Sequence, residues 1–203
     1  MRLTRIKRKS RISQQAKTQA LRIIGGEHRG RRLQFKSAEG LRPTSDRVRE
    51  TLFNWLQPVI SGARCLDMFA GSGLLGMEAA SRGAAEVVFI EQHRATADQL
   101  RENVGKLGLS NTQLINADAF DSLADLQPFD MVFVDPPFHA GLLLRACEQL
   151  QSHHLLKPAS RVYLESELAV EADELPPGWE LIRSKQAGQV FYHLAIIQKD
   201  NPL

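Results

Sequence analysis

Cysteine is scarce in this 203-residue sequence, and its scarcity argues against two ways of stabilising a small fold. The only two cysteines, Cys65 and Cys147, lie 82 positions apart and form no CxxC pair. This spacing indicates neither a disulfide framework nor a zinc knuckle. His139, His153 and His154 also lie away from any carboxylate or cysteine at ligand spacing. We therefore expect no bound metal and a reducing compartment, the cytoplasm.

Long hydrophobic runs are also missing. No apolar stretch approaches the roughly 20 residues that a membrane-spanning helix needs, and the N-terminus lacks the hydrophobic segment of a secretory signal. Apolar residues make up 43% of the chain and charged residues 24%, proportions typical of a globular protein that folds in water. The length accommodates one domain with an appended segment, and we expect a monomer.

Acidic residues are nearly absent from the front of the chain. Positions 1–49 hold 15 Lys and Arg against three Asp and Glu, whereas positions 50–203 hold 11 against 20. A basic arm beside an acidic body is typical of a polyanion binder, because neutralising phosphates releases counterions. A solvated tail and an organellar transit peptide are the alternatives. The basic residues continue into sequence with an ordered pattern, which favours nucleic acid as the partner.

The periodicity divides the chain into three parts. Residues 1–20 are polar and basic without an apolar period, which predicts a flexible arm. Residues 21–58 predict a hairpin and helix extension: strands at 21–24 and 31–35, then a helix capped by Ser45 or Asp46 and ended by Pro58. Residues 59–203 form the main domain, in which strand and helix patterns alternate.

This alternation predicts an α/β fold. Strand patterns occur at 64–69, 86–91, 112–117, 130–135 and 161–165, with helices at 74–82, 93–107 and 141–151. Two further strand patterns, at 179–185 and 189–198, indicate a terminal hairpin. Parallel strands with right-handed helical crossovers give a doubly wound, Rossmann-like, mostly parallel sheet, here of seven strands with one antiparallel. In such sheets ligands bind at the carboxyl ends of the strands.

A glycine-rich loop follows the first strand of this domain. Gly71, Gly73 and Gly76 satisfy GxGxxG, and Glu91 ends the next strand 20 residues after Gly71, where a carboxylate can bind a ribose diol. This motif alone is compatible with NAD, FAD or S-adenosylmethionine.

Asp67 favours S-adenosylmethionine. A carboxylate just before the glycines is unfavourable for the pyrophosphate of a dinucleotide, whereas S-adenosylmethionine has no phosphate and carries an ammonium and a sulfonium. Asp118 follows the third strand, where it can accept a hydrogen bond from an adenine amino group. A loop-capping role for Asp67 and a helix cap by Asp118 are the alternatives. Two carboxylates at successive strand ends together favour a ligand that contains a nucleoside.

The fourth strand ends in Asp135, Pro136, Pro137 and Phe138. Two prolines fix φ and remove two backbone donors, so the corner presents acceptors. Hydrogen bonds from an exocyclic amine to Asp135 and to a nearby carbonyl would localise the nitrogen lone pair for attack on a methyl sulfonium, with catalysis supplied mainly by positioning and electrostatics. Phe138 could stack on the target base. The alternative is a strand terminator with Phe138 in the core.

Four segments resemble the RsmD family of bacterial small-subunit ribosomal RNA guanine-N2 methyltransferases, which have the class I S-adenosylmethionine-dependent fold. They are RIIGGEHRGRRL at 22–33, LRPTSDRVRETLFNWL at 41–56, LDMFAGSGLLGMEA at 66–79 and VDPPF at 134–138. The resemblance implies methylation of the guanine(966)-N2 type in 16S ribosomal RNA, within the 30S subunit or its precursor. A DNA adenine or protein glutamine amino methyltransferase, or a non-catalytic RNA-binding assembly factor, is the alternative.

The resemblance also implies roles for individual residues. It places catalysis at Asp135, Pro136, Pro137 and Phe138. The residues implied to bind S-adenosylmethionine are Asp67, Phe69, Gly71, Gly73, Glu91, Gln92, Asp118 and Ala119. Those implied to receive RNA are Arg42, Thr44 and Arg47, and the basic residues Arg29, Arg31 and Arg32 are further candidates for RNA binding.

Overall fold

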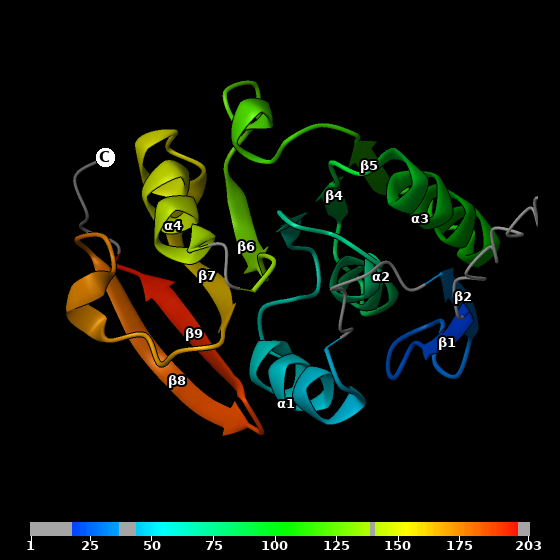
Figure 1. Ribbon diagram of the computed structural model, residues 1–203, viewed down its shortest axis with the longest axis horizontal. Coiled ribbons are helices and arrows are strands. Elements are labelled where there is room, and N and C mark those ends of the chain that lie inside the picture. Colours follow the sequence, from blue (N-terminus) through cyan, green and yellow to red (C-terminus); the bar gives the residue numbers. More distant parts are fainter. Residues whose placement is uncertain (1–17, 37–43, 139–140, 199–203) are drawn as a thin grey trace, which may run out of the picture.

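A seven-stranded sheet forms the centre of the molecule (Figure 1). The computed structural model describes residues 18–36, 44–138 and 141–198. The strand order is β5-β4-β3-β6-β7-β9-β8, and only β9 runs antiparallel to its neighbours. The strands are β3 (Arg64–Asp67), β4 (Glu86–Ile90), β5 (Thr112–Ile115), β6 (Phe129–Val134), β7 (Leu156–Ser166), β8 (Trp179–Ala187) and β9 (Val190–Ile197). The predicted sheet, with its one antiparallel strand, is confirmed.

The order of the strands reverses between β3 and β6. The chain proceeds from β3 through β4 to β5 in one direction, then returns to β6 beside β3 and continues to β7. Connections from the carboxyl ends of β3 and β6 therefore diverge, which makes this point of the sheet the expected place for a ligand.

Helices cover both faces of the sheet. They are α1 (Asp46–Leu56), α2 (Leu74–Ser81), α3 (Arg94–Leu107) and α4 (Leu142–Ser152), with short 3-10 turns η1 (Phe120–Ser122) and η2 (Ala172–Glu174). Because successive strand residues point to opposite faces, Phe133 packs with the α1, α2 and α3 side, and Val132 packs with the α4 side. Ser45 rather than Asp46 caps α1, since its Oγ accepts a hydrogen bond from Val48 N at 3.3 Å.

Two strands begin earlier than the sequence predicts. β7 begins at Leu156 instead of 161, and its register with β6 shifts near Ala159, which has a positive φ of 65°. This irregular start contains a proline and has no alternating pattern, so the sequence does not show it as a strand. The first hairpin strand, β1 (Thr18–Arg22), begins within the polar stretch assigned to the arm, because it pairs along its length with β2 (Arg32–Lys36).

The loop between β1 and β2 docks on the end of α2. The Ser81 hydroxyl donates to Gly25 O at 2.7 Å, and Glu27 N donates to Ser81 O at 2.8 Å. Gly26 has a φ of 74°, and a Cβ there would lie 1.8 Å from Ser81 O. Only glycine satisfies both the conformation and the close approach. The docking places β1 and β2 beside α3 (Figure 1), where Asn103 Nδ2 donates to Gln34 O at 3.1 Å.

A buried ionic cluster joins the same elements. Arg49 of α1 and Glu78 of α2 are both fully buried and lie 3.4 Å apart, Nη1 to Oε2. Glu78 also accepts from Arg82 Nε at 2.8 Å and from Ile24 N at 2.9 Å. Arg49 donates to Arg22 O at 2.9 Å. One carboxylate therefore holds α1, α2 and the hairpin loop together. Across the described residues, no helix has the length and apolar character needed to cross a membrane.

Candidate active site

The glycine loop leaves β3 at its carboxyl end and is held by two carboxylates. Asp67 Oδ2 accepts a hydrogen bond from Gly76 N, and Glu91 Oε2 accepts one from Gly71 N, both at 2.9 Å. The other oxygen of Glu91 accepts from His93 N at 2.7 Å. The loop is thus pre-formed by the residues that the sequence assigns to ligand binding. A carboxylate oxygen has two acceptor positions, so each retains capacity for a further donor.

Gly73 turns the chain into α2. It has a φ of 72°, and a Cβ there would lie 2.1 Å from Leu100 Cδ1. The left-handed conformation and the close packing on α3 both require glycine at this position. Asp67 meanwhile accepts from a backbone N–H in the first turn of α2, so the capping role that the sequence left open for it is present.

Asp67 is the last residue of β3, directly before this loop, and is only 2% exposed. Burial raises the pKa of its carboxyl group to about 7; the Gly76 N–H opposes the shift, and the neighbouring Glu91 adds to it. Near neutral pH this group is therefore poised between its neutral and charged forms, and a cation placed beside it would favour the charged form.

The ends of β4 and β5 are tied together next to the glycine loop. Asn116 Nδ2 donates to Glu91 O at 2.7 Å and to Gln92 O at 3.1 Å. Asp118 is exposed, and its Oδ1 accepts from Phe120 N at 2.9 Å, so the capping role considered for it is also present. Ala119 is buried beside it.

Two aromatic rings flank this corner. Phe69, from the glycine loop, meets Phe120 edge to face at a centroid distance of 6.0 Å. The Arg145 guanidinium of α4 lies 3.9 Å above the Phe120 ring. The loops after β3 and β5 therefore share one aromatic contact at the carboxyl edge of the sheet, where a planar ring could be covered.

The loop after β6 carries Asp135 into a cluster with β7 and the start of α1. Thr44 Oγ1 lies 3.3 Å from Asp135 Oδ2 and 3.2 Å from Glu165 Oε2. Tyr163 donates its hydroxyl to the same Glu165 oxygen at 2.7 Å. Pro136 is buried and Pro137 is exposed, and Phe138 is partly exposed. Asp135 and Glu165 thus lie 91 and 121 positions after Thr44 in the sequence, yet both meet its hydroxyl group.

The cluster brings carboxyl groups together where burial disfavours their charged forms. Burial raises the pKa of Asp135 well above its ordinary value, and Glu165 and Asp67 add to the shift, while the Thr44 hydroxyl opposes it. Burial likewise raises the pKa of Glu165, against hydrogen bonds from Tyr163 and Thr44. Within the described part of the chain, no Lys or Arg forms an ion pair with Asp67, Asp135 or Glu165. The site is therefore suited to a cationic or donor-rich ligand.

The basic residues assigned to RNA have different surroundings. Arg29, Arg32 and Arg47 are exposed. Arg31 is exposed as well, but its Nη2 donates to Lys106 O at the end of α3, at 3.0 Å, so it also anchors the hairpin. Arg42 lies outside the described residues. Thr44 belongs to the carboxylate cluster and not to the basic surface.

Sequence reasoning missed Glu165 and Tyr163. A signal for Glu165 was present, since it is the last residue of the predicted strand 161–165, which pairs with the strand that delivers Asp135. A carboxylate at the end of a strand beside the DPPF corner has the same position in the fold as Asp67 and Glu91. Tyr163 gave no such signal, because an aromatic residue in a buried strand is ordinarily part of the core.

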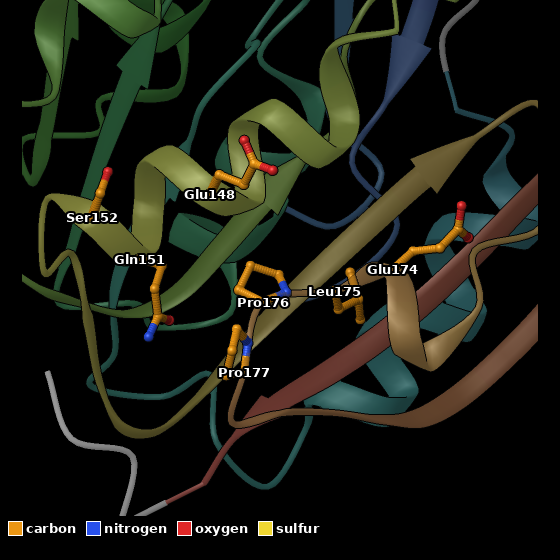
Figure 2. Close-up of a pocket in the computed structure, with 7 residues that line it drawn as sticks. All are labelled: Glu148, Gln151, Ser152, Glu174, Leu175, Pro176 and Pro177. Atoms are coloured by element: carbon orange, nitrogen blue, oxygen red, sulfur yellow. The ribbon is translucent and has the colours of Figure 1, made fainter.

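A separate depression of about 390 Å³ lies between α4 and the segment after η2 (Figure 2). None of the residues predicted for the site lines it. Its walls carry two carboxylates and two prolines, and Trp179 Nε1 beneath it donates to Gln151 Oε1 at 2.9 Å. The lining residues are Glu148, Gln151, Ser152, Glu174, Leu175, Pro176 and Pro177.

Comparison with known proteins places the chain in one family. The family model described as "Conserved hypothetical protein 95" matches residues 21–196. "Ribosomal RNA small subunit methyltransferase D" of Escherichia coli strain K12 is 49% identical over 175 residues, which cover 86% of this chain and 88% of that protein. The protein of the same name from Haemophilus influenzae is 46% identical over 182 residues, covering 86% of this chain and 92% of the relative.

The solved structures agree with the sequence comparison. The Escherichia coli methyltransferase yhhF superposes with a TM-score of 0.79 at 44% identity, covering 90% of this chain and all of that one (100%). The match includes the glycine loop, the DPPF corner and the N-terminal hairpin, since the family model begins at residue 21. The chain therefore belongs to the RsmD family of methyltransferases.

Proposed function

We propose that the protein transfers a methyl group from S-adenosylmethionine to the exocyclic N2 amine of a guanine in 16S ribosomal RNA, within the small subunit or its precursor. The observation that carries the proposal is the DPPF corner at the point where the strand order reverses, beside the glycine loop. Family membership supports it, because the relatives are named for the small-subunit RNA. The target is of the guanine-966 type that the sequence resemblance implies.

The charge of the site suits the proposed cofactor. Asp67 and Glu165 are buried and Asp135 is partly exposed, and none of the three carboxyl groups has an ion-pair partner among the described residues. S-adenosylmethionine carries two positive charges and no phosphate, and it supplies an electrophilic methyl group on its sulfonium. In this proposal Glu91 accepts hydrogen bonds from the ribose and Asp118 from the adenine, and the Phe69 and Phe120 rings flank the same corner.

The DPPF corner binds and orients the amine. Asp135 Oδ1 has no hydrogen-bond donor among the described residues, so it remains open to accept from an amine N–H. A carbonyl held rigidly next to two prolines takes the second N–H. These two bonds hold the nitrogen lone pair toward the methyl donor, and the alkylated amine, now strongly acidic, releases its proton to the carboxylate or to water. Phe138 is partly exposed and available for stacking on a base that has left its helix.

Methyl transfer to undermethylated 30S particles tests this function. With labelled S-adenosylmethionine, we expect one guanine of 16S RNA to acquire label, identified by mass as N2-methylguanine. The Asp135→Ala variant should reduce the turnover number by on the order of 100- to 1000-fold, because it removes an electrostatic contact to the reacting nitrogen. Asp173→Ala, which changes an exposed carboxylate in η2, serves as the matched control.

Other outcomes identify the alternatives. Label in DNA or in protein glutamine would assign the chain to another amino methyltransferase. Full biological function of Asp135→Ala, together with no detectable binding of S-adenosylmethionine by calorimetry, would indicate a non-catalytic assembly factor.

A further inference from the structure

We infer that Glu165 is a specificity residue that accepts a hydrogen bond from N1–H of the target guanine while Asp135 accepts from its N2 amine. The inference rests on the proposed function and extends it to a residue for which the sequence predicts no role. It starts from the geometry of the cluster, in which Asp135 Oδ2 and Glu165 Oε2 lie 3.3 and 3.2 Å from the same Thr44 hydroxyl.

The cluster has too few donors for its acceptors. The Thr44 hydroxyl has one hydrogen and cannot donate to both carboxylates at once. Tyr163 supplies a second donor, to Glu165 Oε2. Among the described residues, Asp135 Oδ1 and Glu165 Oε1 have none. Both oxygens reach solvent, so a ligand that brings adjacent N–H groups can pair with them in place of water.

Guanine has the required pattern of donors. Its Watson–Crick edge presents N1–H next to two N–H bonds of the N2 amine, so it offers adjacent donors to two adjacent acceptors. In adenine the ring nitrogen beside the amine is an acceptor, and it would face a carboxylate across the site. Two carboxylates on neighbouring strand ends therefore favour guanine over adenine, and disfavour adenine by repulsion between acceptors.

Glu165 is held in place independently of the substrate. It is 4% exposed and is the next-to-last residue of β7, a strand paired on both sides. Burial and the nearby carboxylates raise the pKa of Tyr163 well above its ordinary value, so its hydroxyl stays protonated as the donor that fixes Oε2. Recognition by a pre-positioned acceptor loses little conformational entropy on binding.

RNA with 2-aminopurine at the target position tests the inference. This base retains the 2-amine but has no hydrogen on N1. For wild-type protein we expect kcat/KM at least about 30-fold lower with 2-aminopurine than with guanine in otherwise identical reconstituted particles, because a charged acceptor is left unpaired. For Glu165→Ala the ratio of kcat/KM on guanine to kcat/KM on 2-aminopurine should fall to about threefold or less, mainly through loss of activity on guanine. Glu165→Gln, whose amide oxygen still accepts, should keep an intermediate ratio.

Controls separate this role from others. Glu180→Ala, an exposed carboxylate on β8, should retain the wild-type ratio. Equal activity of the wild type on both bases, or a ratio unchanged in Glu165→Ala, would overturn the inference while leaving the proposed function intact. An affinity for S-adenosylhomocysteine reduced more than about tenfold in Glu165→Ala would overturn it too, by assigning the carboxylate to the methyl donor. A wild type inactive on guanine would instead refute the proposed function.

Discussion

Single side chains in this site combine structural and chemical roles. Asp67 supports the first turn of α2 through Gly76 N and also faces the ligand edge of the sheet with a pKa of about 7. Glu91 supports the glycine loop in the same way. The capping roles that the sequence offered as alternatives to ligand binding are compatible with it, because each carboxylate has more acceptor positions than its capping bond uses.

The raised pKa of Asp67 makes cofactor affinity depend on pH. A ligand ammonium binds more strongly to the charged carboxylate, so affinity should fall as the pH drops below about 7, by up to about tenfold per pH unit for this group. We expect calorimetry with S-adenosylhomocysteine between pH 5.5 and 8 to show tighter binding at higher pH, with proton release on binding. Asp67→Asn should weaken the dependence of affinity on pH, so that only the contribution of Asp135 remains. A flat wild-type profile would contradict this prediction.

At the scale of elements, α2 connects the glycine loop to the N-terminal hairpin. Its first turn meets the glycine loop, and its last turn holds the hairpin loop through Ser81 and the buried Glu78. The strands and helices could be predicted from their apolar runs, since parallel strands buried on both faces are nearly continuous hydrophobic segments. The docking of the hairpin loop on α2 could not be predicted, because it depends on contacts between residues more than 50 positions apart.

Replacing Glu78 should loosen the hairpin. Glu78→Ala removes the buried carboxylate partner of the fully buried Arg49 and leaves it only the exposed Asp46, at 2.6 Å. We expect a loss of about 3–5 kcal/mol in the free energy of unfolding, measured with urea, because breaking a buried pair on one side has that cost. Hydrogen exchange at Ile24 should also accelerate. The exposed Glu148→Ala should change stability by less than about 0.5 kcal/mol. A loss below about 1 kcal/mol for Glu78→Ala would mean that Asp46 alone compensates the charge of Arg49.

The whole molecule separates its charges along the sequence. Net positive charge lies in residues 1–49 and net negative charge in the remainder, and the described hairpin and α1 present Arg29, Arg32 and Arg47 to solvent. Composition alone predicted this polarity and with it a nucleic-acid partner. Composition could not show that Thr44, counted among the RNA-binding residues, contacts Asp135, since only tertiary packing brings the two together.

The salt dependence of RNA binding should reveal whether the exposed arginines contact RNA phosphates. We expect the triple variant Arg29→Ala, Arg32→Ala and Arg47→Ala to bind small-subunit RNA more weakly. The slope of log affinity against log salt should fall by about 0.7–0.9 for each RNA phosphate that the variant no longer neutralises. Arg183→Ala, which changes an exposed arginine of β8, should leave the slope near the wild-type value. An unchanged slope in the triple variant would place the RNA on another surface.

The docked hairpin also constrains the order of folding during synthesis. Residues 18–36 leave the ribosome early, but their partners Glu78, Ser81 and Asn103 follow much later in the chain. Contacts of such long sequence separation form only after the intervening segment exists and its loop has closed. The N-terminal hairpin therefore completes its packing after α2 and α3 have emerged, so a segment that is made early is among the last to be stabilised.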